Sequence, residues 1–168
     1  MGRFEIREAS AADYDALGEL TVRAYRSLAG MPPLEEAPGY YAELADVRGR
    51  AAAESNRILA AYDEAGRLLG GTTFIDEVYG KLWGLENSAG IRMLVVDPDV
   101  QAAGVGRALV EYSLDRARGL GRRTFLLHTT RPMERAQRMY AKFGFRREPD
   151  LDFDYEGMRV MGYLLELS

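Results

Sequence analysis

Residues 90–109 read Gly-Ile-Arg-Met-Leu-Val-Val-Asp-Pro-Asp-Val-Gln-Ala-Ala-Gly-Val-Gly-Arg-Ala-Leu, and this stretch decides how the rest of the chain is interpreted. The apolar run from Gly90 to Asp97 predicts a central strand, which ends at Pro98 because proline cannot donate to the hydrogen-bond ladder of a sheet. Apolar residues at helical spacing then predict a helix over residues 104–120. A strand is therefore followed by a short loop and by a helix that has two glycines at its start.

The two glycines, Gly104 and Gly106, predict an anion site, since they let a phosphate approach the free backbone N–H groups of a helix start. A P-loop would need Lys and then Ser or Thr after the last glycine, where this chain has Arg107-Ala108. A dinucleotide-binding fingerprint would need Gly or Ala at Leu109 and a shorter distance from the strand. Two interpretations remain: another kind of phosphate loop, or an ordinary helix start with two turn glycines.

The periodicity of the chain before this stretch alternates between strand and helix patterns. It predicts a strand over residues 3–8, helices over residues 11–29 and 40–53, and strands over residues 57–62 and 68–78. Gly66 lies between the last two strands and suits the positive φ of a hairpin turn. The strands joined by this hairpin are therefore expected to pair in antiparallel fashion.

The chain after this stretch continues the alternation. It predicts a strand over residues 124–130, a helix over residues 133–143, and strands over residues 145–147 and 158–167. The strand–helix–strand crossover over residues 90–130 requires a parallel pair, because its two strands run in the same direction. We therefore expect an α/β fold with a mixed sheet and helices on both faces.

A second motif lies one crossover after the glycines: residues 136–145 read Ala-Gln-Arg-Met-Tyr-Ala-Lys-Phe-Gly-Phe. Together with Gln101-x-x-Gly104-x-Gly106, this block resembles the GCN5-related N-acetyltransferase (GNAT) family. The resemblance covers essentially the whole chain and is clearest over residues 90–146. It implies one N-acetyltransferase domain over residues 1–168. It also implies a mixed, mostly antiparallel, strongly twisted seven-stranded sheet with about four helices, splayed between the fourth and fifth strands.

The resemblance implies acetyl-CoA as co-substrate. The backbone of Leu94, Val95 and Val96 would bond the pantetheine amides in the gap beside the splayed strand. The pyrophosphate would be held by the N–H groups of Gln101, Ala102, Ala103, Gly104, Val105, Gly106 and Arg107. The Arg107 side chain either adds charge there or is a solvated surface residue. Met133 occupies a cofactor-contacting position at which the family often has Asn.

The resemblance also implies a reaction: direct attack of a primary amine on the thioester, with Tyr140 as the general acid that protonates the leaving thiolate. A core tyrosine is the alternative interpretation of Tyr140. The N–H of Val95 or Val96 would meet the oxyanion. The base stays unassigned, because Gly90 stands where relatives often have Glu.

The acceptor site in this family is built from the first two helices, their loop and the last hairpin. The candidates for substrate binding are Tyr25, Glu35, Glu86, His128, Asp152 and Tyr155. Carboxylates and aromatic rings together suit an ammonium group, so we expect a cationic amine of a small molecule or peptide. The alternatives are a non-catalytic acyl-CoA sensor or partner-binding module on the same scaffold, O-acylation, and a longer acyl group.

The composition excludes several classes of site. The chain has 168 residues and no cysteine, which excludes disulfides, thiolate nucleophiles and cysteine-based metal sites. The net charge of −4 argues against a nucleic-acid partner. No run approaches the roughly 18 apolar residues of a membrane span, and the N-terminus shows no signal peptide. We therefore expect a cytoplasmic protein that needs no metal, and a homodimer is compatible with the family.

Overall fold

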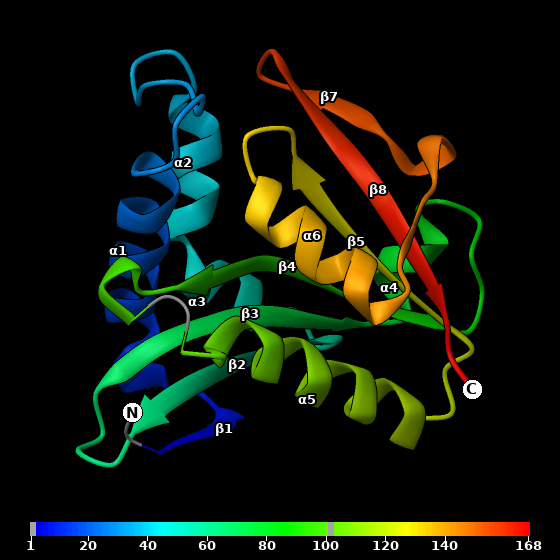
Figure 1. Cartoon of the computed structure of the whole chain (residues 1–168), viewed down its shortest axis with the longest axis horizontal. Helices are drawn as coiled ribbons and strands as arrows, with labels where there is room; N and C mark the ends of the chain where they lie inside the picture. The colour runs from blue at the N-terminus through cyan, green and yellow to red at the C-terminus, as the bar shows by residue number, and fades with distance from the viewer. Residues whose placement is uncertain (1–2, 101–102) are drawn as a thin grey trace.

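The computed structural model describes residues 3–100 and 103–168 and has a mixed α/β architecture (Figure 1). Its sheet has eight strands in the order β1-β2-β3-β4-β5-β8-β6, and β7 pairs with β8 outside this path. β4 and β5 are parallel, and the other pairs are antiparallel. The strands are β1 (Phe4–Glu8), β2 (Asn56–Asp63), β3 (Leu68–Asp76), β4 (Ser88–Val96), β5 (Thr124–Thr130), β6 (Arg146–Arg147), β7 (Phe153–Tyr155) and β8 (Met158–Glu166).

The helices cover both faces of this sheet (Figure 1). They are α1 (Tyr14–Arg26), α2 (Pro38–Ala45), α3 (Val47–Ala51), α4 (Val78–Lys81), α5 (Val105–Gly119) and α6 (Glu134–Phe143). The core on one face packs α5 and α6 against the strands, with Leu109, Phe125 and Tyr140 among its buried residues. The core on the other face packs α1, α2 and α3 against Ile58 and Val95.

The predicted fold class is confirmed, and two local predictions need correction. Residues 40–53 do not form one helix, because the chain leaves the helical region at Asp46 (φ −86°, ψ 64°). The Asp46 carboxylate then accepts a hydrogen bond from the Gly49 amide and caps α3 (2.9 Å). Residues 153–155, for which no strand was predicted, form β7 on β8 and add an eighth strand.

The splay between β4 and β5 follows from how far the two strands pair. Their ladder runs from Ser88↔Thr124 to Ile91↔Leu127 and goes no further. Just beyond Ile91, Met93 takes a left-handed conformation (φ 57°), and the register with β3 shifts opposite Thr72. This is a β-bulge, which bends a strand and increases its twist. Figure 1 shows β4 and β5 starting side by side and then diverging.

The bulge and the divergence leave backbone groups of β4 without a strand partner. The Asp97 amide donates to the Leu69 carbonyl (2.8 Å), and Val96 faces Gly70 as the next pair. Hydrogen-bonded and non-hydrogen-bonded pairs alternate in antiparallel ladders, so the N–H and C=O of Val96 point away from β3. The next pair, Val95 with Gly71, is again a bonded one. Val96, not Val95, therefore offers its N–H to the gap.

An ion cluster around the buried carboxylate of Asp97 anchors the end of β4. The Asp97 carboxylate accepts from the Asp99 amide (2.9 Å) and from Arg67 (3.0 Å), and it lies 3.5 Å from a guanidinium nitrogen of Arg23. Burial raises the pKa of Asp97, but the Asp99 amide and the two guanidiniums outweigh that effect and hold this pKa below its ordinary value. The cluster ties the diverging end of β4 to α1 and β3.

Candidate functional site

A large cleft of about 620 Å³ opens where β4 has left β5. We call it the large cleft. Its walls are the end of β4, the first turn of α5, one side of α6 and the last turns of α1. The backbone of Leu94, Val95 and Val96 lies along it, so the strand edge described above faces this space. Met133 also lines it, at the start of α6.

The first turn of α5 presents free N–H groups to the large cleft. Gly104 caps the helix in the left-handed conformation (φ 83°) that favours glycine, and the Ala108 amide donates to its carbonyl (3.0 Å). The N–H groups of Val105, Gly106 and Arg107 precede that bond and have no partner within the helix. A Cβ at Gly106 would lie 3.3 Å from the side chain of Val96, so this glycine keeps the helix close to β4.

The charge of this region suits an anion. The cleft lining includes three cationic side chains, Arg107, Arg135 and Lys142, beside the positive end of the α5 dipole. Arg107 also pairs with Glu111 one turn later (3.0 Å). Ala103 packs against the core before the helix. The predicted phosphate contacts Gln101 and Ala102 lie outside the described residues.

Behind the large cleft lies a cavity of about 20 Å³, the inner cavity, at the point where the two strands separate. Tyr25 of α1 and Tyr140 of α6 reach it from opposite faces of the sheet. The Tyr25 hydroxyl donates to the Leu94 carbonyl (3.2 Å). The Tyr140 ring packs edge-on against Phe145, with 5.8 Å between centroids. Met133 lines both this cavity and the large cleft, which makes the two spaces neighbours.

Burial sets the protonation of the two phenols. It raises the pKa of Tyr140 well above the ordinary value, and the nearby Tyr163 acts in the same direction. Burial likewise raises the pKa of Tyr25, with Tyr140 as the next cause. Both hydroxyls therefore keep their protons at neutral pH. The Tyr25 proton is engaged by a carbonyl, so Tyr140 is the better placed proton donor in the inner cavity.

On the far side of the inner cavity lies a third space of about 70 Å³, the outer pocket. It shares Tyr25, Met93 and His128 with the inner cavity. Arg92 of β4 is also common to both spaces. The side chains that line the outer pocket alone come mainly from α2, α4 and the β7–β8 hairpin: Tyr40, Glu43, Tyr79, Phe153 and Tyr155. Large cleft, inner cavity and outer pocket thus form one series through the splay.

The two outer walls of the pocket are joined by one carboxylate. Glu156, at the tip of the β7–β8 hairpin, accepts hydrogen bonds from the amides of Gly39 (3.2 Å) and Tyr40 (3.0 Å) at the start of α2. The Tyr40 ring then lies between Tyr25 and Tyr155, at centroid distances of 6.3 and 5.9 Å. A carboxylate suits the start of a helix, so this contact also favours α2.

The structure brings three of the six predicted acceptor residues together. Tyr25, His128 and Tyr155 line the outer pocket. Glu35 and Glu86 are exposed in loops and are not part of its lining. Asp152 lies outside the lining too, in a contact network of its own.

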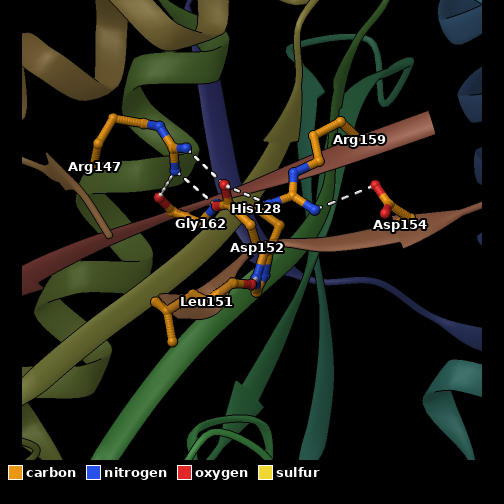
Figure 2. Close-up of polar contacts among 7 residues, drawn as sticks. All are labelled: His128, Arg147, Leu151, Asp152, Asp154, Arg159 and Gly162. Atoms are coloured by element: carbon orange, nitrogen blue, oxygen red, sulfur yellow. Dashed lines mark hydrogen bonds and ion pairs between the residues drawn. The ribbon is translucent and has the colours of Figure 1, made fainter. Parts of the chain in front are cut away.

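Asp152 is engaged by arginines of its own neighbourhood (Figure 2). Its side chain is 5% exposed. Arg147 donates to both carboxylate oxygens at 2.8 Å, the Gly162 amide donates at 2.7 Å, and Arg159 lies 3.6 Å away. These bonds fix the segment before β7 against β8. Asp152 therefore has a structural role, which the sequence-based assignment did not foresee.

His128 has both ring nitrogens engaged. Nε2 lies 2.7 Å from the Leu151 carbonyl, and Nδ1 shares a short hydrogen bond with the Tyr79 hydroxyl (Figure 2 shows the first partner). Burial lowers the pKa of His128, so the ring is neutral near pH 7. Because a carbonyl can only accept, the single ring proton lies on Nε2 and Nδ1 accepts from Tyr79. His128 is therefore a fixed wall of the pocket and not a free base.

The lining residues that sequence reasoning missed include Glu43, Tyr79 and Arg92. A signal for Arg92 was present, because it is the one charged residue inside the apolar run of residues 90–96. A charge in such a run needs a specific reason to be there. Tyr79 follows the strand predicted over residues 68–78, where no element was predicted, and its packing over Gly90 brings it to the pocket.

No helix among the described residues is long and apolar enough to cross a membrane. Within residues 3–100 and 103–168, no three His, Asp or Glu side chains form a group that could hold a metal ion.

Comparisons with known proteins agree with the geometry. A family model described as the acetyltransferase (GNAT) family matches residues 15–145. A search of curated proteins found no significant match.

Solved structures match over nearly the whole chain. A GNAT-family acetyltransferase from Staphylococcus aureus Mu50 has a TM-score of 0.77 and 16% identity, covering 99% of this chain and 100% of its own. The PaiA N-acetyltransferase from Thermoplasma acidophilum, solved in complex with coenzyme A, has a TM-score of 0.74 and 18% identity, with coverage of 95% and 98%. The yncA protein of Salmonella typhimurium, solved with acetyl-CoA, has a TM-score of 0.67 and 21% identity, with coverage of 99% and 95%. At these identities the likeness shows the fold.

The Asp152 network gives a testable prediction. The hydrogen bonds from Arg147 lower the pKa of Asp152, although burial opposes them. Replacing the carboxylate in Asp152→Asn should lower the free energy of unfolding by about 1.5–3 kcal/mol at pH 7. Asp154→Asn, at a side chain that is 71% exposed, should change it by less than about 0.5 kcal/mol. Urea unfolding of the two variants and the wild type measures both values.

The pH dependence of the folding stability follows from the direction in which the pKa of Asp152 is shifted. The pKa of folded Asp152 lies below the value of 3.8 expected for an unfolded aspartate. Its contribution to stability is therefore complete above about pH 4 and is lost as the pH falls through the folded pKa. The difference in the free energy of unfolding between wild type and Asp152→Asn should therefore shrink as the pH falls below about 4. A difference that stays constant down to pH 2 would contradict the assigned network.

Proposed function

Since the chain belongs to the acetyltransferase (GNAT) family, whose model spans residues 15–145, we propose that it is a single-domain N-acetyltransferase that transfers the acetyl group of acetyl-CoA to a primary amine. One observation carries this proposal: the large cleft, the inner cavity and the outer pocket form one series through the β4–β5 splay. A binding module that only senses an acyl-CoA would need the large cleft alone. A transferase needs a second entrance for its acceptor.

The large cleft would hold the coenzyme. The N–H groups of residues 104–107 and the cations around them suit a pyrophosphate at the start of α5. The unpaired edge of β4 at Val96 suits the amides of a pantetheine arm, which would pair with it as an added strand does. Coenzyme A and acetyl-CoA in the two related structures support this assignment.

The inner cavity would be the place of reaction. Acetyl-CoA supplies an acetyl group activated as a thioester. Tyr140 would hold its proton until the sulfur leaves and donate it there, which makes the thiolate a better leaving group. Tyr25 would stay bonded to the Leu94 carbonyl and fix the wall of the cavity.

The amine would enter through the outer pocket. An alkylammonium with a pKa near 10.4 is almost fully charged at pH 7, so its proton must be lost before attack. His128 does not serve as the base, because both its nitrogens are bonded and its proton lies on Nε2. We propose that the proton leaves to water at the open side of the pocket, near Glu43.

The cofactor assignment is tested by binding. Acetyl-CoA at 100 times its Kd should stabilise the wild type by about 2.7 kcal/mol in a thermal-shift titration. Gly106→Glu should lose this response, because its carboxylate would enter the large cleft where the phosphates bind. Gly119→Glu, at the other end of α5 with nothing within 4 Å, should keep it. Circular dichroism checks that both variants fold. An unchanged response in a folded Gly106→Glu would refute the assigned site.

The role of Tyr140 is tested against a matched variant. Tyr140→Phe should lower kcat for thiol release by roughly 100-fold or more, because the ring keeps its packing and only the proton donor is lost. Tyr25→Phe removes a similarly buried hydroxyl but should cost less than about 10-fold. Stopped-flow or steady-state detection of free coenzyme A with a panel of amines measures both. A larger loss in Tyr25→Phe would show that the acid is assigned to the wrong tyrosine.

A further inference from the structure

The guanidinium of Arg92 in the outer pocket is only weakly neutralised by its surroundings. Two side chains of opposite charge line the pocket, Arg92 and Glu43. A guanidinium nitrogen of Arg92 lies 3.9 Å from a Glu43 oxygen, at the limit of an ion pair, and the two side chains are 36% and 48% exposed. A contact of this length and exposure stabilises little. Arg92 therefore retains hydrogen-bonding capacity toward a ligand.

Arg92 lies where the acceptor must pass. It lines both the inner cavity and the outer pocket, so its guanidinium belongs to the approach to the reacting atoms. The guanidinium carbon lies 6.0 Å from the centre of the Tyr79 ring, which forms the floor beneath it. Its charge also reaches the other phenols of the site, lowering the pKa values of Tyr25 and Tyr40 against the effect of burial.

The second guanidinium in the neighbourhood, that of Arg50, adds to the positive field. Arg50 donates to the Thr73 hydroxyl (3.1 Å) and the Leu44 carbonyl (3.3 Å), and it also contacts the Glu43 carbonyl. These hydrogen-bond partners are neutral, although the carboxylates of Asp46 and Glu43 also act on the charge of Arg50. Burial lowers the pKa of Arg50 to about 10, and the positive charge of Arg92 is the next cause. Two cations therefore face this side of the sheet.

We propose that the acceptor carries a carboxylate next to its amine, as a free α-amino acid does, and that Arg92 binds this carboxylate. The proposal rests on the proposed function and names its substrate class. A planar guanidinium can bind a carboxylate with two parallel hydrogen bonds. Since Arg92 borders the inner cavity, an anion bound there keeps the adjoining amine within reach of the thioester. The rings of Tyr40, Phe153 and Tyr155 leave an apolar wall for a side chain.

This proposal differs from the sequence-based expectation of carboxylates that bind a cationic amine. Of the three carboxylates predicted for the acceptor site, Glu35, Glu86 and Asp152, none lines the outer pocket. Glu43 does line it, but its side chain is about half exposed. Water screens its repulsion of a bound carboxylate.

Binding of reaction products tests the proposal without requiring turnover. N-acetyl-L-alanine, N-acetyl-L-methionine and N-acetyl-L-phenylalanine are compared with their carboxamides by isothermal titration, with coenzyme A present and absent. At least one acid should bind the wild type about 10- to 100-fold more tightly than its amide. Arg92→Gln should remove this preference, and Arg92→Lys should keep part of it. Arg48→Gln, which removes a charge at an exposed site, should change nothing.

Turnover separates the failure of this proposal from that of the proposed function. Each amino acid is compared with its amide and its decarboxylated amine as acceptor. Preference for the carboxylate-bearing acceptors, lost in Arg92→Gln mainly through KM, supports the assignment. Turnover of the decarboxylated amines alone, or equal binding of acids and amides, would overturn it and leave the proposed function intact. If acetyl-CoA does not bind, the proposed function fails, and the titrations still decide the role of Arg92.

Discussion

The separation of β4 from β5 after Ile91 is the constraint on which the rest of the site depends. The ladder stops there, and the bulge at Met93 and the ion cluster around Asp97 hold the two strand ends apart. Every later feature uses the resulting gap. It frees the backbone of Val96, admits α5 to the edge of the sheet, and lets Tyr25 and Tyr140 meet from opposite faces. A fully paired β4 and β5 would close the large cleft and the inner cavity together.

The sequence predicted the fold and the helix start well, because both follow from local backbone rules. Gly104 and Gly106 after an apolar strand indicated a free helix start, and the structure has one. The break between α2 and α3 was missed because Leu44, Val47 and Ala51 keep helical spacing through it. Only the cap formed by Asp46 reveals it. β7 was missed because three residues are too few for a strand pattern.

The acceptor side could be predicted only in part, because contacts between distant segments decide it. The family's layout and the charges of the chain suggested Glu35, Glu86 and Asp152. In the structure the first two are exposed in loops outside the pocket lining, and Arg147 engages the third. Arg92 was overlooked as a member of an apolar strand. Its place in the pocket depends on α2 and on the β7–β8 hairpin, which Glu156 joins across more than a hundred residues of chain. Our proposal for the acceptor therefore rests on an arginine and not on the carboxylates that the sequence suggested.

The central claim is that the edge of β4 left free by the splay binds the coenzyme. Residue-resolved amide hydrogen exchange by NMR, with and without acetyl-CoA, tests it most directly. We expect the amides of Val96, Val105, Gly106 and Arg107 to exchange much more slowly with acetyl-CoA bound, while the β1–β2 pairs at the far edge of the sheet stay unchanged. Binding of acetyl-CoA without protection of Val96 would contradict the claim, because the coenzyme would then lie somewhere other than the splay.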